Sequence, residues 1–147
     1  MEYYPPIPRG SITLQTDGNL FLGILQDITS LHVVLDGAGA TTLQMSTLVN
    51  SVTSLTIDSV TLNTLELTNS PALASVTFET SAPLSSVTAT GLALPVAAVD
   101  AIIAACVTGG HPGGVLNISG GTSAAPSGAS TANLATLAGD GWTVTTN

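Results

Sequence analysis

The chain is almost without basic residues. Nine Asp and Glu residues stand against a single Lys or Arg, which is Arg9, and the formal net charge is −8 at pH 7. Proteins neutralise the phosphates of nucleic acids with clustered Lys and Arg side chains. They use the same residues to approach anionic membrane surfaces. The sequence therefore argues against a nucleic acid or a membrane as the partner.

Long apolar runs are also missing, although 44% of the residues are hydrophobic. The longest run, residues 92–107, is broken by Pro95 and Asp100 and is shorter than the roughly 20 residues that span a bilayer. We therefore expect no transmembrane helix. Residues 1–6 have neither the basic nor the apolar region of a secretory signal, so we expect none. The single cysteine, Cys106, excludes an intrachain disulfide.

Aromatic side chains make up only 3% of the chain, while Thr, Leu, Ala, Ser and Gly dominate it. Small side chains bury little area each, so they cannot build a thick core. Disorder is a poor explanation, because disordered chains contain few β-branched residues and this one contains many. The composition favours a thin core of β-branched and small aliphatic residues.

Short apolar alternations recur every 10 to 12 residues along the chain. Within each unit the period is two, which is typical of a strand with alternate side chains pointing inward and outward. Turn formers such as Asp36-Gly37 separate the units. Several units carry a further apolar residue three positions upstream, which gives an L-x-x-L-x-L pattern. The alternations begin at Leu31, Leu43, Leu55, Leu65, Val76 and Val87, and the upstream residues are Val52, Leu62, Leu73 and Leu84.

A unit of one strand and one corner cannot bury its apolar face alone, so successive units must stack. The sequence thus predicts a mainly β fold, a short-repeat, leucine-rich-repeat-like β-solenoid with a C-terminal α/β cap. We divide it into an extended N-terminal arm over residues 1–18, solenoid repeats over 19–91 and a capping segment over 92–147. A β-sandwich, whose strands recur at similar spacing, is the alternative.

The capping segment has its own pattern. Apolar residues at helical spacing predict a helix over 95–107. Pro95 suits its first turn, and Gly109-Gly110 is the stop signal that follows it. A strand over 115–118, a short helix over 130–138 and a strand over 142–145 follow. Because the last coil of a solenoid exposes its apolar end, a cap is needed there. Trp142, the single tryptophan, is predicted to anchor it.

The L-x-x-L-x-L units resemble short leucine-rich-repeat-like solenoids, and the C-terminal run resembles a cap of virion proteins from tailed bacteriophages. The units lack the Asn of the standard leucine-rich repeat, with Val60, Ser70 or Ser81 in its place, which favours a flatter coil over a curved horseshoe. The segments that carry the resemblance of the cap are Val99-Asp100-Ala101-Ile102-Ile103, residues 115–122, Ala125-Pro126, Ala135-Thr136-Leu137 and Gly141-Trp142-Thr143-Val144.

This resemblance implies a structural protein of a phage particle, either a capsid decoration or a fibre component, assembled in the host cytoplasm. Its partners would be other virion proteins and copies of itself, with a trimer as the first expectation. The alternative function is a glycan-binding or adhesive surface module that binds a receptor.

Residues suited to chemistry are few, so we predict no enzyme and no catalytic, metal or cofactor site. His111 lies in a predicted loop without a nucleophile motif, and Cys106 lies on the apolar face of the predicted helix. Asp58, Glu66 and Glu79 follow different strands and can share a face, but nothing in the sequence says that they converge. Solvated carboxylates are the favoured interpretation.

If alternate units share a sheet, their outward residues form two arrays. One is His32, Thr56 and Thr77, and the other is Gln44, Glu66 and Thr88. Flat threonine arrays on solenoids resemble those of ice-binding proteins, which we keep as a minor alternative. Threonine is also simply well suited to the outward face of a strand.

The N-terminal segment combines two tyrosines with three prolines. Prolines favour an extended conformation, and tyrosine brings contact area at little entropic cost. We therefore predict that this segment docks into a groove of another subunit, with a disordered terminus as the alternative. The docking residues are Tyr3, Tyr4, Pro5, Pro6, Ile7, Pro8 and Arg9.

Overall fold

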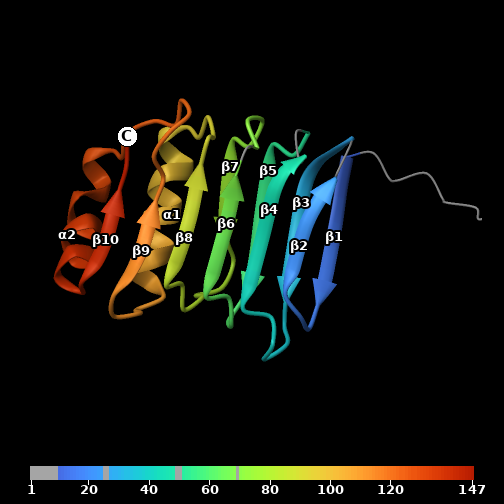
Figure 1. Ribbon diagram of the computed structural model, residues 1–147, viewed down its shortest axis with the longest axis horizontal. Helices are drawn as coiled ribbons and strands as arrows, with labels where there is room; N and C mark the ends of the chain where they lie inside the picture. Colours follow the sequence, from blue (N-terminus) through green and yellow to red (C-terminus); the bar gives the residue numbers. More distant parts are fainter. Residues whose placement is uncertain (1–9, 25–26, 49–50, 69) are drawn as a thin grey trace, which may run out of the picture.

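The computed structural model describes residues 10–24, 27–48, 51–68 and 70–147, which form two parallel sheets stacked face to face as a β-solenoid (Figure 1). From β1 to β8 consecutive strands alternate between the sheets, and every described strand pair is parallel, which a Greek-key sandwich does not allow. The predicted fold class is therefore confirmed. Sheet A contains β1 (Gly10–Thr16), β3 (Ile28–Leu35), β5 (Ser54–Ser59) and β7 (Ser75–Phe78). Sheet B contains β2 (Leu20–Ile24), β4 (Thr42–Leu48), β6 (Thr64–Thr68), β8 (Ser86–Thr90), β9 (Gly114–Asn117) and β10 (Trp142–Thr145).

The repeat places equivalent apolar residues in register from coil to coil. Leu31 pairs with Leu55, which pairs with Val76 in sheet A. These side chains and their counterparts in sheet B are buried between the sheets. Burying one such side chain contributes about 1.5–3 kcal/mol, so the ladder of aliphatic residues holds successive coils together. The upstream residues of the pattern complete this core at the corners.

The corners between the strands are tied by short hydrogen bonds. Ser59, although buried, accepts bonds from the backbone amides of Thr61 and Leu62 through its hydroxyl. The carbonyl of Thr41 accepts from the amides of Asn63 and Thr64 in the next coil. These bonds satisfy backbone groups at the corners that the sheets themselves leave unpaired.

The C-terminal segment continues sheet B and replaces the strands of sheet A with helices. α1 (Val96–Thr108) follows β8 and leads into β9, and a single turn η1 (Gly128–Ser130) with α2 (Thr131–Gly139) leads into β10. Figure 1 shows α1 behind β8 and β9, and α2 at the end of the row, beside β10. The predicted helices and strands of this segment are confirmed to within one residue. Because β9 pairs with β8, the segment extends the solenoid as well as capping it.

The solenoid begins at β1, within the residues assigned above to the arm. β1 pairs along its length with β3, so residues 10–16 belong to the first coil and not to an arm that extends to residue 18. In the sequence, the alternation Ile12-x-Leu14 is the signal of this strand. The predicted docking residues Tyr3 to Arg9 lie outside the described residues. Within the described part of the chain, neither helix has the length and apolarity needed to cross a membrane.

Candidate functional site

The two predicted outward arrays exist. In sheet A, His32 is in register with Thr56 and Thr56 with Thr77. In sheet B, Gln44 is in register with Glu66, and Glu66 in turn with Thr88. Because side chains alternate along each strand, these residues lie on the faces opposite the core. The molecule therefore has two outward faces of different chemistry.

The outward face of sheet B is almost uncharged. Of the acidic residues that the structure describes, Glu66 alone occupies an outward position on β4, β6, β8, β9 or β10, and neutral polar side chains fill most of the others. Glu66 interrupts the threonines near the middle of the face, so no regular threonine array forms there. The outward residues are Thr42, Gln44, Thr64, Glu66, Thr68, Ser86, Thr88, Thr90, Val115, Asn117, Thr143 and Thr145.

The outward face of sheet A carries a cluster of His32, Asp58 and Glu79. One ligand atom from each residue lies within 4.8 Å of the other two. His32 lies on β3, Asp58 on β5, and Glu79 directly follows β7, whose register continues through a hydrogen bond from the Glu79 amide to the Ile57 carbonyl. The cluster thus combines residues of two neighbouring strands with the residue that follows a third.

Two contacts define the geometry of this acid–histidine cluster. His32 Nε2 lies 3.5 Å from Glu79 Oε2. Asp58 Oδ1 accepts a hydrogen bond of 2.9 Å from the Thr80 hydroxyl, whose oxygen accepts the Ser59 amide at 2.7 Å. Thr80 therefore fixes the Asp58 carboxylate to the corner of the coil, while the more exposed Glu79 can rotate.

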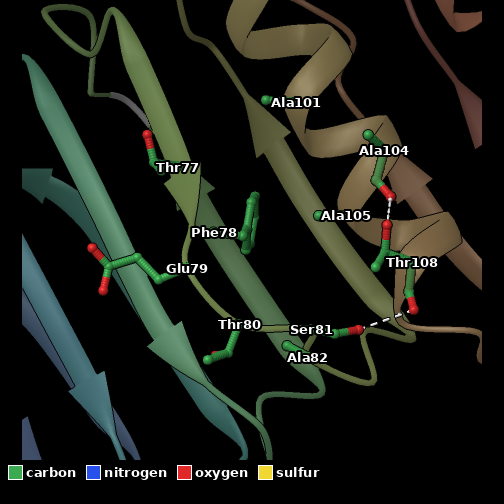
Figure 2. A pocket seen from close by; sticks show the side chains of 10 residues that line it. All are labelled: Thr77, Phe78, Glu79, Thr80, Ser81, Ala82, Ala101, Ala104, Ala105 and Thr108. Carbon is green, nitrogen blue, oxygen red and sulfur yellow. Dashed lines mark hydrogen bonds between the residues drawn. The ribbon is translucent and has the colours of Figure 1, made fainter.

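Beside the cluster lies a groove of about 410 Å³ between the end of β7 and α1 (Figure 2). Its wall on α1 consists of small side chains, Ala101, Ala104 and Ala105. The groove exists because α1 takes the place of the next strand of sheet A. Phe78 is therefore only partly covered, whereas its ladder partner Ile57 is 1% exposed.

Polar contacts close one end of this groove. The Ser81 hydroxyl donates to the Thr108 carbonyl at 3.0 Å, and the Thr108 hydroxyl donates to the Ala104 carbonyl at 2.8 Å. Figure 2 shows that the Glu79 carboxylate extends away from α1. The acid–histidine cluster and the alanine wall are therefore on opposite sides of β7.

A separate carboxylate, that of Asp100, holds parts of the cap together. Asp100 on α1 accepts hydrogen bonds from the Ser127 amide and from the hydroxyls of Ser127 and Ser130, at 3.0, 2.6 and 2.6 Å. The Ser127 hydroxyl bond, followed by the Ser130 bond, lowers the pKa of the Asp100 carboxyl below its ordinary value. This contact ties α1 to the turn that starts α2, which is a structural role.

The remaining residues that the sequence singled out lie apart from both features. Cys106 is buried in α1, and desolvation raises the pKa of its thiol to about 12, so the thiolate is scarce. His111 Nδ1 lies 2.8 Å from the Gly113 carbonyl. Trp142 is buried, and its indole donates to the His111 carbonyl at 2.8 Å.

The chain was compared with protein-family models, curated proteins and solved structures, and none of the three comparisons found a match.

Sequence reasoning identified the carboxylates but not their grouping. Asp58 and Glu79 converge with His32, whereas Glu66 lies on the other sheet. Asp58 and Glu79 thus share a face, as the sequence allowed, and lie close to His32, which the sequence did not indicate. The sequence pattern does not show that His32 and Asp58 are diagonal neighbours. His32 is in register with Thr56, and Asp58 is two residues further along the same strand. Long side chains reach such diagonal neighbours across a sheet.

Proposed function

We propose that the protein is a structural component of a phage particle, a capsid decoration or a part of a fibre, that acts through protein–protein contacts and not as an enzyme. The observation that carries the contact role is the nearly uncharged outward face of sheet B. The phage assignment rests on the resemblance of the C-terminal segments to virion caps. A homo-oligomer, with a trimer as the first expectation, is part of the proposal.

The charge distribution favours the face of sheet B as the contact surface. The chain carries a net charge of −8, so copies repel each other over most of their surface. Sheet B contributes one carboxylate to its outward face, whereas sheet A presents Asp58 and Glu79. Neutral polar and small side chains are desolvated at less cost than charges. Two copies therefore approach with the least penalty through sheet B.

A matched pair of substitutions tests the contact surface. Thr88→Glu places a second carboxylate beside Glu66 in the middle of sheet B, and Thr77→Glu places the same charge on the outward face of sheet A. Sedimentation equilibrium of the wild type and both variants should show an oligomer that Thr88→Glu dissociates and Thr77→Glu preserves. A wild type that stays monomeric at tens of micromolar, or equal effects of the two variants, would refute this surface.

The particle assignment needs its own measurement. Mass spectrometry of purified particles should detect this chain, at hundreds of copies for a capsid decoration or a few to dozens for a fibre. Absence from particles would overturn the assignment. If the chain is absent from particles and binds specific glycans on a glycan array, the alternative function, a glycan-binding module, would be supported instead.

A further inference from the structure

The acid–histidine cluster of His32, Asp58 and Glu79 has the composition of a metal site. An imidazole nitrogen and two carboxylates are ligands that divalent transition ions accept together. Their mutual separation of at most 4.8 Å is close to the span of ligands around one ion, given metal–ligand bonds of about 2.0–2.2 Å. Glu79 is 49% exposed, so its side chain can rotate to shorten the remaining gap.

The imidazole provides an independent sign of a missing ligand. His32 Nε2 is shielded from solvent and has no hydrogen-bond partner, even though Glu79 Oε2 lies 3.5 Å away. Shielded polar atoms in folded proteins nearly always have a partner, and each exception needs an explanation. A metal ion bound to Nε2 supplies that partner.

The charge around the cluster also favours a cation. Asp58 and Glu79 bring two carboxylates together. The described residues contain no Lys or Arg to neutralise them, because the single Lys or Arg of the chain is Arg9. The hydrogen bond from Thr80 to Asp58 Oδ1 holds one of the carboxylates in place. A bound divalent ion would relieve the repulsion between the two groups.

We propose that His32, Asp58 and Glu79 bind one divalent transition-metal ion, Zn²⁺ or Mn²⁺, on the outward face of sheet A. Imidazole selects for such ions over Ca²⁺ and Mg²⁺, which prefer sites made of oxygen ligands. The ion would join β3, β5 and the end of β7, and so would clamp three successive coils. Binding to the folded state alone would stabilise the solenoid. The site is independent of the contact surface on sheet B.

Isothermal titration calorimetry of the full chain with ZnCl₂ and with MnCl₂ tests the proposal. The wild type should bind one equivalent of at least one ion. His32→Asn and Glu79→Gln should each weaken the affinity by about tenfold or more. Loss of a group that only supports a ligand already costs about 10–100-fold, and each of these variants alters a ligand itself. Circular dichroism of the metal-free variants checks that they are folded, because both residues are partly exposed.

Matched controls separate this site from adventitious binding. His111→Asn removes the other histidine, and Glu66→Gln removes a carboxylate on the opposite sheet. Both variants should keep the wild-type affinity and the metal-induced rise in melting temperature. The proposal fails if the wild type binds neither ion below millimolar concentration. It also fails if the His32 and Glu79 variants bind as the wild type does, or if Ca²⁺ binds equally well without need of His32.

Discussion

Replacing Trp142 tests how the last coil is held. Its side chain is 6% exposed, its indole donates to the His111 carbonyl at 2.8 Å, and it is in register with Gly114. Truncating a buried Trp to Ala costs about 3–5 kcal/mol of unfolding free energy through lost burial and a cavity. Trp142→Phe keeps most of the apolar area and loses the hydrogen bond, at a cost of about 1–2 kcal/mol.

The loss should be local, because each coil of a solenoid contacts only its neighbours. Hydrogen exchange of the Trp142→Ala variant should show reduced protection in β9 and β10 and unchanged protection in β5 and β6. Leu65→Ala is the comparison, since Leu65 is fully buried in β6 at the centre of the column. That variant should lower the global stability by about 2–5 kcal/mol.

Urea unfolding followed by far-UV circular dichroism measures both variants, since replacing the single tryptophan removes the fluorescent probe. A change below about 1 kcal/mol in the free energy of exchange of β9 and β10 in Trp142→Ala would show that the indole does not anchor the cap. Equal loss of protection in all strands would refute the assumption that coils act as separate units.

Three further predictions concern the same half of the chain. Gly114→Ala should destabilise the protein, because the added Cβ would lie 2.6 Å from the Ser85 carbonyl oxygen and 2.9 Å from the Trp142 ring. The melting temperatures of the variant and the wild type check this. Folding lowers the pKa of Asp100, so its stabilising effect is present above the ordinary carboxyl pKa and fades as the pH falls through the folded value. Asp100→Asn should therefore reduce stability near neutral pH and flatten the acid limb of the pH–stability curve, whereas an unchanged limb would contradict this assignment. Cys106 should react with a thiol reagent in urea but hardly at all in the folded protein, since burial raises its pKa to about 12.

The sequence by itself determined the strands and the direction in which their side chains point. A period of two at Leu31, Leu55 and Val76 assigns inward and outward positions, and recurrence every 10 to 12 residues forces stacking, because one unit cannot bury its own apolar face. The helix that contains Asp100 and Cys106 was equally predictable, since its apolar residues follow the helical period and Pro95 stands at its start.

The tertiary structure alone decided the diagonal contacts between coils and the groove beside α1. The acid–histidine cluster depends on the register of three strands from separate repeats and on a diagonal offset that the pattern within one repeat does not contain. The groove beside α1 arises because a helix replaces a strand in sheet A, so Phe78 loses a neighbour on one side. Local pattern specifies which residues face outward, but contacts across the sheet depend on how distant segments align, and that alignment is a property of the whole stack.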